Sequence, residues 1–357
     1  MPPDFAPTPE QQAVIDDRAG TLVVLAAVGS GKTTTLARRV AALVSEDGVA
    51  PERIVGVTFT NRAAAHMRAA VADTLGAGPA RRVHLGTFHA LCADILRGAT
   101  GVAGLPSDLR IIDEDDMDEM LRELGAHTPS RVRYKLQGDA ADVPLGAATL
   151  ALWREGRWSR SGMAARFADA LVEQGAVDFA SLVLLTRAVL NEDAGVRAAW
   201  ASRFDAVVVD EVQDTHLSEY AVLRVLAATA RSRCFVGDLD QTIYSWRGSA
   251  PQALLDRLDA DLGPVRRRAL TASFRATEAL VALTDAVAAE MPERASAVAP
   301  GPGLPAGEPA SVVAYDDERE ELAGVAADCR ARLDAGATPG DLAVLARTNR
   351  TVTALAQ

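Results

Sequence analysis

A series of short, Val-rich runs, separated by segments with helical periodicity, is the feature that most constrains the fold. The runs before residue 271 are TLVVL (21–25), RIVGVTF (53–59), VHLGTF (83–88), DAVVVDE (205–211), CFVGD (234–238) and VRRRAL (265–270). Most of them do not alternate between apolar and polar residues, which is typical of strands buried on both faces. Strands that alternate with helices predict an α/β fold, in which helices cover both faces of a parallel sheet.

Length and composition place the chain among globular proteins with more than one domain. Its 357 residues are enough for two or three domains, and 49% are hydrophobic. No apolar run reaches membrane-spanning length, and the N-terminus MPPDFAPTPEQQ lacks a secretory signal. Cys92, Cys234 and Cys329 form no CxxC pair, so we expect a protein of the reducing cytoplasm. Because no apolar run is long enough to span a membrane, we expect no membrane partner. The net charge of −11 argues against a broadly basic surface but not against a local basic groove.

The chain changes character twice along its length. Residues 98–177 lack strong Val-rich runs and contain the helical patterns DMDEMLREL and GMAARFADALVEQ, which predict a mostly helical insertion. A second change comes at Gly263–Pro264, followed by two more strand candidates, SVVAY (311–315) and DLAVLAR (341–347). The predicted domains are 1–97 with 178–263, the insertion 98–177, and a third segment 264–357. The basic runs RVRYK (131–135) and WREGRWSR (153–160) can be either DNA contacts or an ordinary solvated face.

The stretch LAAVGSGKTTTL (25–36) directly follows the first strand candidate and resembles the phosphate-loop pattern G-x-x-x-x-G-K-[ST], with Ala26 at the first glycine. We expect the backbone N–H groups of Gly29, Ser30, Gly31, Lys32 and Thr33 to surround the β-phosphate of ATP, with Thr34 extending the helix start. Lys32 is expected to reach the β- and γ-phosphates, and the Thr33 hydroxyl to bind Mg²⁺. The alternative is a glycine-rich turn between a strand and a helix, with a surface lysine.

An acidic pair follows a second buried run, in VVVDEVQDT. Asp210 lies at the predicted carboxyl end of this strand, where open α/β sheets bind ligands. We expect Asp210 to hold Mg²⁺ and Glu211 to act as the base that polarises the attacking water. The alternative for such a pair taken alone is a strand end with two solvated acids.

Several segments together resemble the UvrD/Rep/PcrA group of superfamily 1 DNA helicases. VDEVQDT is similar to the VDEFQDT box of this family, and the phosphate loop to its AGAGSGKT, from which only Ala27 and Val28 depart. The other similar segments are TPEQQAVI, VTFTNRAAAHM, GTFHALCADILR, VDFASLVLLTRAVL, FVGDLDQTIYSWRGS, LTASFRAT and LARTN. The resemblance covers almost the whole chain and implies a RecA-like P-loop NTPase domain, a helical insertion and a second RecA-like domain.

The resemblance also implies roles for individual residues. Gln11 is expected to read the adenine edge, Phe274 to stack on the adenine, Gln241 to contact the γ-phosphate and Arg275 to stabilise the transferred phosphate as an arginine finger. Aromatic and small polar groups are expected to hold single-stranded DNA by stacking and phosphate contacts. The expected DNA-binding residues are Phe59, Thr60, Asn61, Thr87, His89, Tyr244, Trp246 and Arg247.

The second motor domain is expected to be incomplete in this chain, because neither the T-x-H-x-x-K-G box nor the V-G-x-T-R-A box of the family occurs. We therefore interpret the sequence as the N-terminal portion of an ATP-dependent helicase that moves 3′-to-5′ on single-stranded DNA or at junctions, in repair or recombination. One alternative is a nucleotide-gated DNA-binding or regulatory module without motor activity. A small-molecule kinase is a weaker alternative, since a kinase has no use for the QTIYSWRG box.

Overall fold

The computed structural model describes residues 6–99, 105–106, 108–130, 162–243, 249–291, 294 and 297–356. By contacts the chain divides into two compact units, residues 1–307 and 308–357. The first unit contains the helices α1 (Pro9–Asp16), α2 (Lys32–Ser45), α3 (Asn61–Leu75), α4 (Ala77–Ala80), α5 (Phe88–Gly98), α6 (Glu114–Glu123), α9 (Met163–Glu173), α10 (Phe179–Glu192), α11 (Ala194–Ala201), α12 (Leu217–Ala227), α13 (Pro251–Leu262) and α14 (Glu278–Ala289). Its strands are β1 (Gly20–Ala26), β2 (Ile54–Thr58), β3 (His84–Thr87), β4 (Arg110–Ile112), β5 (Ala176–Asp178), β6 (Ala206–Val209), β7 (Ser232–Gly237), β8 (Val265–Leu270), β9 (Ala272–Ser273) and β10 (Ala299–Pro300).

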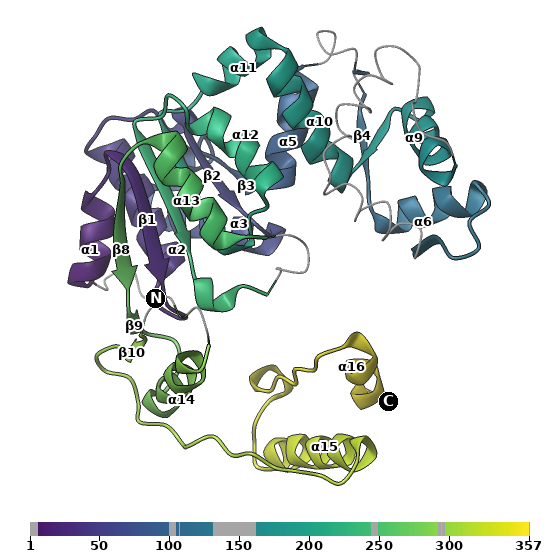
Figure 1. Ribbon diagram of the computed structural model, residues 1–357. Helices are drawn as coiled ribbons and strands as arrows, with labels where there is room; N and C mark the ends of the chain where they lie inside the picture. Colours follow the sequence, from purple (N-terminus) through teal and green to yellow (C-terminus); the bar gives the residue numbers. More distant parts are fainter. Residues whose placement is uncertain are drawn as a thin grey trace. The chain divides into compact units, whose positions relative to one another are not determined.

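A six-stranded parallel sheet with the strand order β3-β2-β6-β7-β1-β8 forms the centre of the first unit (Figure 1). All six runs before residue 271 that were predicted to be strands lie in this sheet. The predicted α/β fold with a parallel sheet is therefore confirmed. Neighbouring residues of a strand point to opposite faces, and both faces of this sheet are apolar. This explains why the runs do not alternate in polarity.

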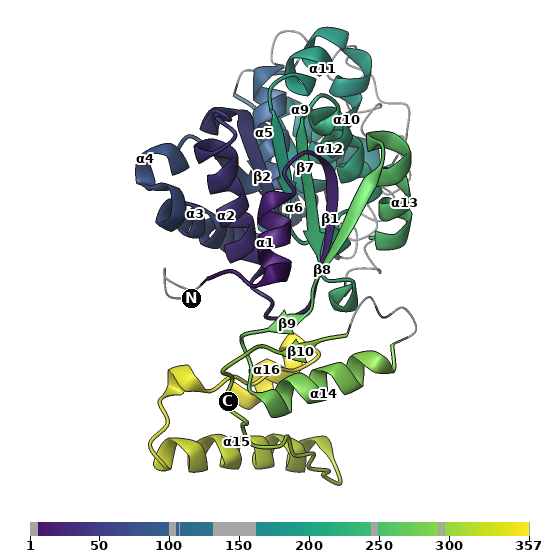
Figure 2. The same ribbon diagram turned by 90° about the vertical axis from the view of Figure 1, so that its left-hand side faces the viewer.

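Two separate hydrophobic clusters cover the two faces of the sheet. Val23 of β1 and Val207 of β6 pack with side chains of α5, α10, α12 and α13 on one face. Leu22 of β1 and Val208 of β6 pack with side chains of α1, α2 and α3 on the other. Figures 1 and 2 show these two groups of helices on opposite sides of the sheet. Alternate side chains of the Val-rich strands therefore pack into two different hydrophobic cores.

The insertion between β3 and β6 has a small core of its own. In its described part, α6 and α9 match the two helical patterns of the sequence. A short parallel pair, β4 and β5, was not predicted. Met117, Met120, Leu121 and Phe167 are among the buried residues of this core. The basic runs at 131–135 and 153–160 lie outside the described residues.

β8 lies at the edge of the main sheet, next to β1, with Thr21 opposite Val265 and Ala26 opposite Leu270. This differs from the predicted start of a third segment at residue 264. The division by contacts falls instead after Gly307. The physical reason is that β8 completes the hydrogen bonding of one side of β1, so it belongs to the sheet of the first unit.

The second unit contains α15 (Glu318–Asp334) and α16 (Asn349–Ala356). The strands expected at 311–315 and 341–347 are corrected by the structure, which has no strand among the described residues of 308–356. Val312 and Leu345 in these two segments are 99% and 94% exposed. Among the residues that the structure describes, neither segment has a neighbouring strand to pair with, and an isolated extended segment leaves its N–H and C=O groups without ladder partners.

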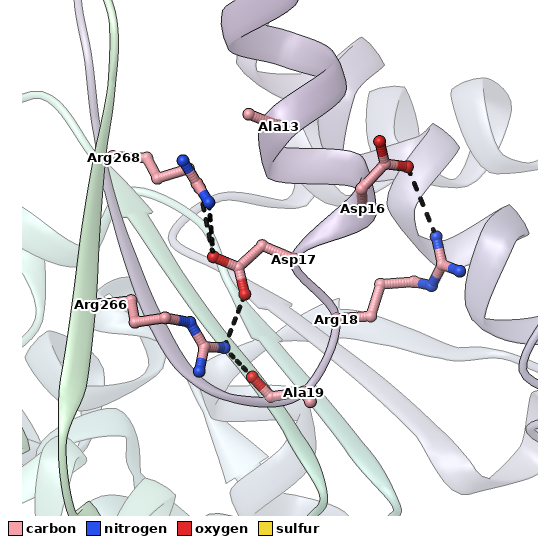
Figure 3. A pocket seen from close by; sticks show the side chains of 7 residues that line it. All are labelled: Ala13, Asp16, Asp17, Arg18, Ala19, Arg266 and Arg268. Carbon is pink, nitrogen blue, oxygen red and sulfur yellow. Dashed lines mark hydrogen bonds and ion pairs between the residues drawn. The ribbon is translucent and has the colours of Figure 1, made fainter.

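A surface pocket lies where α1 leads into β1, and Figure 3 shows the charged side chains that line it. The carboxylate of Asp17 lies between two arginines of β8, 2.6 Å from Arg266 Nη2 and 3.1 Å from Arg268 Nη2. This pocket is at the amino end of β1, whereas ligands of open α/β sheets bind at the carboxyl ends. Its guanidinium groups already have an anionic partner, so we assign it a structural role.

The ion pair between Arg53 and Asp205 gives a pH-dependent prediction for stability. The two side chains join the starts of β2 and β6, with Arg53 Nε 2.5 Å from Asp205 Oδ2. The hydrogen bond from Arg53 lowers the pKa of Asp205 in the folded protein. Its stabilisation is therefore present above the unfolded pKa, about 3.9, and is lost as the pH falls through the lower folded pKa.

We expect the Asp205→Asn variant to unfold more easily than the unsubstituted chain near neutral pH, with a difference that shrinks below about pH 4. Urea unfolding at several pH values measures it. The control is Glu52→Gln in the pair with Arg82, where both side chains are more than half exposed and the N···O distance is 3.5 Å. That variant is expected to change stability little at any pH. A difference for Asp205→Asn that stays constant down to pH 3 would contradict the prediction.

Candidate nucleotide-binding site

The loop between β1 and α2 has the backbone geometry of an anion-binding turn. Gly29 and Gly31 have φ angles of 75° and 80°, in the left-handed region that glycine adopts without strain. Gly31 is the N-cap of α2, and no side chain caps this helix start. The N–H groups of the first turn of α2 therefore have no intrahelical acceptor, and the positive end of the helix dipole points into the loop. A phosphate group fits this arrangement.

Three neighbouring segments hold the loop in place. The N–H of Ala27 donates to the carbonyl of Leu270 at the end of β8, with a distance of 2.9 Å. Nε2 of Gln11, from α1, donates to the carbonyl of Ser30 at 3.0 Å. The N–H of Phe274 donates to the carbonyl of Gly29 at 2.9 Å. The loop is thus fixed by α1 on one side and by the segment after β8 on the other.

The two departures from the family loop fit within this geometry. The Ala27 methyl group is buried, with 6% of the residue exposed, while Val28 is half-buried.

The Oγ of Ser30 is buried and has no hydrogen-bond partner in the described structure. Buried hydroxyl groups are usually paired, so an unpaired one inside a loop of this kind fits a site built for a polar ligand.

The ammonium group of Lys32 forms an ion pair with Glu211, with 3.1 Å between Nζ and Oε2. Lys32 is the first residue of α2, and Glu211 follows β6. Glu211 has φ 55° and is the only residue other than glycine with positive φ in the described part of the chain. Such a conformation is unfavourable for a side chain with Cβ and is found most often at functional sites. The structure therefore brings together a predicted phosphate ligand and a predicted base.

The polar contacts of Glu211 continue beyond the lysine. Gln213 donates from Nε2 to Glu211 Oε2 at 2.9 Å, and its Oε1 accepts from the N–H of Asp238 at 3.1 Å. Gln241 in turn donates to Asp238 Oδ2 at 2.7 Å. The sequence analysis did not single out Gln213 and Asp238. Each is a polar residue inside one of the boxes VDEVQDT and FVGDLDQ, and its position next to the predicted site residues could have identified it.

Burial changes the acidity of the carboxyl groups at this edge of the sheet. Asp210 is 6% exposed, and burial, followed by the nearby charge of Glu211, raises its pKa to about 6. Burial also raises the pKa of Asp214 to about 6, and it raises the pKa of Asp238. A buried carboxylate is costly unless a cation neutralises it. The position and chemistry of Asp210 therefore fit a divalent cation placed near the phosphate loop, and Thr33 lies half-buried in the first turn of α2.

Gln11, Phe274 and Arg275 all lie beside the phosphate loop. Gln11 is 4% exposed, and its Oε1 accepts from the N–H of Thr8 while its Nε2 contacts Ser30. Phe274 is half-buried, Arg275 is exposed, and a Cβ added at Gly29 would come within 2.9 Å of Arg275 Cβ. The hydrogen bonds of Gln11 engage one donor and one acceptor of an amide that has two of each.

The described residues of the predicted DNA-binding set lie at the carboxyl ends of the adjacent strands β2 and β3 and at the starts of the helices α3 and α5 that follow them. Thr58 of β2 lies opposite Thr87 of β3, so the segments that follow them leave the sheet side by side. Thr60 and Thr87 are the N-caps of α3 and α5, accepting from Ala63 N and Ala90 N. Phe59 is half-buried and Asn61 is exposed, while the ring of His89 packs edge-on against Phe179 at 5.2 Å. Tyr244, Trp246 and Arg247 lie outside the described residues.

One small pocket lies between Phe59 and the acidic pair, Asp210 and Glu211. It lies at the carboxyl ends of β2 and β6, and Phe59, Asp210 and Glu211 are among the residues that line it. Thr58 Oγ1 is buried there without a hydrogen-bond partner in the described structure. The predicted DNA-facing aromatic residue and the predicted catalytic carboxylates therefore share a surface.

Comparison with known proteins places this geometry in a family. The model of the UvrD/REP helicase N-terminal domain matches residues 7–260, which include the phosphate loop and Glu211. This chain belongs to that family. The resemblance stated from the sequence is thereby confirmed, and the P-loop fold follows from it.

Among curated relatives of this UvrD/REP domain, the ATP-dependent DNA helicase Rep of Escherichia coli (strain K12) is 32% identical over 262 residues, or 69% of this chain and 38% of that protein. DNA helicase II of the same strain is 30% identical over 350 residues, covering 95% and 48%. The ATP-dependent DNA helicase UvrD1 of Mycobacterium leprae (strain TN) is 30% identical over 371 residues, covering 96% and 47%. The chain thus spans less than half the length of these relatives. No helix in the described part of the chain has the length and apolar character to cross a membrane.

Gly29 provides a test of the loop geometry in this UvrD/REP domain. A Cβ there would come within 2.5 Å of Ser273 Oγ and 2.9 Å of Arg275 Cβ. We expect Gly29→Ala to weaken ATP binding and to lower the free energy of unfolding by about 2–4 kcal/mol, the sum of the left-handed backbone cost and overpacking. Isothermal titration and urea unfolding measure the two effects.

The matched control is Gly48→Ala. Gly48 has φ 67°, also in the left-handed region, but a Cβ there would meet nothing within 4 Å. This variant is expected to lose about 1 kcal/mol of stability and no ATP affinity. If both variants cost the same stability and bind ATP equally well, the close packing of residues 273–275 on the phosphate loop is not important for the site.

Proposed function

We propose that this chain is the ATP-binding, N-terminal part of a UvrD/Rep-like DNA helicase. The whole protein would couple ATP hydrolysis to 3′-to-5′ movement on single-stranded DNA or at junctions with duplex DNA, in repair or recombination. The observation that carries the proposal is the ion pair between Lys32 of the phosphate loop and Glu211 at the end of β6. This pair brings the proposed phosphate ligand and the proposed base together at one edge of a sheet whose sequence matches a helicase family.

ATP would bind with its phosphates in the loop from Gly29 to Thr34. Lys32 would leave Glu211 for the β- and γ-phosphates, since a phosphate group carries more negative charge than one carboxylate. The free donor and free acceptor of the Gln11 amide match the N7 acceptor and the N6 donor of adenine. Phe274 would stack on the base, because its own N–H donates to the Gly29 carbonyl and so holds it beside the loop.

A divalent cation would neutralise the phosphates, and Thr33 and Asp210 are the residues proposed to hold Mg²⁺. When bound, the ion would stabilise negative charge on the transferred phosphate. Glu211, once released from Lys32, would accept a proton from the attacking water, and Gln213 remains to orient its carboxylate. Gln241 and Arg275 would contact the γ-phosphate; both are exposed at the same end of the sheet and can move toward it.

Single-stranded DNA would cross the carboxyl ends of β2 and β3. Phe59, Thr60, Asn61, Thr87 and His89 lie at these strand ends and at the helix starts that follow, and Tyr244, Trp246 and Arg247 are proposed to complete the site. Phe59 shares a pocket with Asp210 and Glu211, so a base that moves the Phe59 loop also changes the surroundings of the catalytic carboxylates. This shared surface supports a coupling between DNA binding and hydrolysis.

The second unit would be the beginning of a second RecA-like motor domain. Similarity to DNA helicase II covers 95% of the chain, which must include part of residues 308–357. The three free cysteines are consistent with a reducing compartment, and we place the protein in the cytoplasm. Repair or recombination proteins are the proposed partners.

The activity of this chain tests the proposal against the regulatory alternative. We expect the chain to bind ATP with Mg²⁺, and single-stranded DNA to raise its rate of ATP hydrolysis. Lys32→Ala is expected to weaken ATP binding at least tenfold, because the loop loses its charge-assisted contacts to phosphate. Arg122→Ala, which also removes a positive charge but from the exposed surface of α6, is the control and is expected to behave like the unsubstituted chain.

Two results would change this assignment. If ATP and single-stranded DNA bind but DNA does not stimulate hydrolysis, the chain acts as a nucleotide-gated binding module without motor activity. If Lys32→Ala binds ATP as well as the unsubstituted chain, the loop is not the nucleotide site.

Phe59 gives a separate test of the DNA surface. We expect Phe59→Leu to weaken binding of an oligo-dT by roughly tenfold, since stacking of one base contributes about 1–3 kcal/mol. Phe59→Trp keeps an aromatic face and is expected to retain most of the affinity. Fluorescence anisotropy at fixed salt measures both, and equal affinities for the Leu and Trp variants would rule out stacking on this residue.

A further inference from the structure

Arg39 is a fully buried arginine whose partners are not acidic groups. It lies on α2, seven residues after Lys32, and its side chain is 0% exposed. Arg39 takes part in no ion pair within the described part of the chain, and its Nε has no hydrogen-bond partner there. Burying a guanidinium is costly unless its hydrogens find acceptors. The contacts that it does make should therefore explain its presence.

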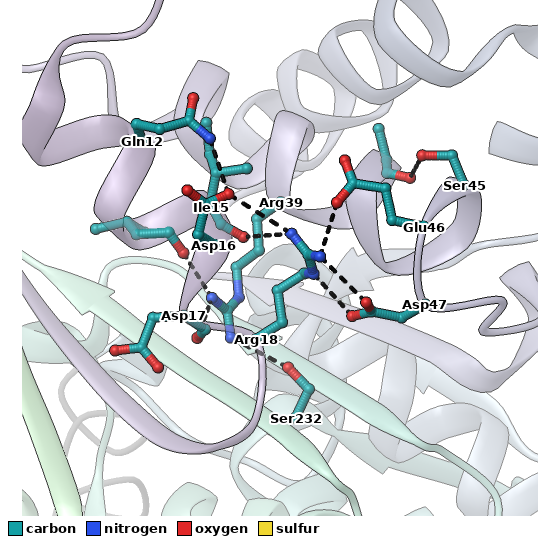
Figure 4. A network of polar contacts seen from close by, with 12 residues as sticks. Gln12, Ile15, Asp16, Asp17, Arg18, Arg39, Ser45, Glu46, Asp47 and Ser232 are labelled. Carbon is teal, nitrogen blue, oxygen red and sulfur yellow. Dashed lines mark hydrogen bonds and ion pairs between the residues drawn. The ribbon is translucent and has the colours of Figure 1, made fainter.

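The guanidinium of Arg39 holds the C-terminal end of α1, as Figure 4 shows. Its Nη1 donates to the carbonyls of Val14 and Asp17, both at 2.6 Å. Its Nη2 donates to Ser232 Oγ at the start of β7, at 3.1 Å. The last carbonyls of a helix lack intrahelical donors and carry the negative end of its dipole, so a buried cation stabilises them strongly.

Helix α1 carries Gln11 at its other end. Gln11 is the third residue of α1, next to Thr8, which caps the helix and accepts a hydrogen bond from the N–H of Gln11. Its amide reaches across to the carbonyl of Ser30 in the phosphate loop. A helix of eight residues is about 12 Å long and moves as one rigid piece. What holds the C-terminal end of α1 therefore contributes to the position of the Gln11 amide, together with Glu10, whose carboxylate accepts from the N–H and Oγ1 of Thr271 at 2.8 and 2.7 Å.

We propose that Arg39 is a positioning residue for nucleobase recognition, because it clamps α1 and thereby holds the Gln11 amide beside the phosphate loop. Arg39 and Lys32 both belong to α2, which begins at the end of the phosphate loop, so the proposed base contact and the Lys32 phosphate contact share one helix as support. The inference rests on the proposed function, in which Gln11 contacts the adenine.

Two other sets of contacts reach this end of α1: the pairs of Asp17 with Arg266 and Arg268 of β8, and a more exposed network around Arg18. Arg18 donates to the carbonyl of Ile15 at 3.2 Å and pairs with Glu46 and Asp47. The carboxylates of that network are 37% and 60% exposed, and exposed pairs contribute little. Arg18→Met is therefore the matched control, since it removes an arginine from the same helix end but leaves the buried contacts.

The test compares two ligands, ATP and inorganic tripolyphosphate, which has the phosphates but no base. Affinities for both are measured with Mg²⁺ by titration calorimetry on the whole chain. We expect the unsubstituted chain to prefer ATP, and Gln11→Ala to lose about tenfold of that preference, as for one hydrogen bond to a ligand. Arg39→Met is expected to lose a similar part of the preference while binding tripolyphosphate nearly normally. The double variant is expected to lose no more than Gln11→Ala alone.

The ratio of the two affinities separates positioning from general support of the fold. Both ligands bind the folded protein only, so a reduced folded fraction affects both alike and cancels in the ratio. If Arg39→Met does not fold, Arg39→Gln, which is neutral and can still donate to one carbonyl, is used and is expected to change the ratio in the same direction.

An unchanged ratio in a folded Arg39 variant, with a changed ratio in Gln11→Ala, would overturn the inference and leave the proposed function intact. A shift in the ratio for Arg18→Met as large as that for Arg39→Met would also overturn it. If Gln11→Ala keeps the full preference for ATP, base recognition by Gln11 is wrong, and this inference fails with it.

Discussion

All six strands of the main sheet run parallel, and this single constraint brings Lys32, Glu211 and Asp238 to the same edge of the sheet. Parallel strands require crossover connections, so each strand ends at the same edge of the sheet and each connecting helix begins there. Lys32 follows β1, Glu211 follows β6, and Asp238 follows β7, which lies between them. Residues about 180 positions apart in the chain, Lys32 and Glu211, thereby come within 3.1 Å.

The electrostatics of this edge show a site arranged for a charged ligand. Buried carboxyl groups with raised pKa values, the uncapped start of α2 and the ion pair between Lys32 and Glu211 lie together. The buried carboxyl groups and the uncapped helix start do not stabilise the fold by themselves. The left-handed backbone of Glu211 has a cost, and buried polar groups without partners have another. Such costs are usual where a structure is organised for binding.

Local sequence patterns predicted the main sheet well, because buried parallel strands need continuous apolar runs that few other structures use. They predicted the short insertion strands β4 and β5 poorly, since three residues are too few for a periodicity. The apolar segments 311–315 and 341–347 also look like strands, yet they have no partner in the described structure. Strand formation depends on a neighbour as well as on composition. For the same reason, the boundary at residue 264 did not anticipate that β8 pairs with β1.

The sequence by itself determined the α/β class, the phosphate loop and the family, because each depends on residues close together in the chain or on boxes in a fixed order. Tertiary structure alone decided that Lys32 forms an ion pair with Glu211 and that Gln213 and Asp238 connect Glu211 to Gln241. It also decided that Arg39 donates hydrogen bonds to the C-terminal end of α1. The contacts between Lys32 and Glu211, between Gln213 and Asp238, and between Arg39 and α1 join segments far apart in the sequence. Their partners are often backbone carbonyl and N–H groups, which every residue carries and which therefore leave no signal in the sequence.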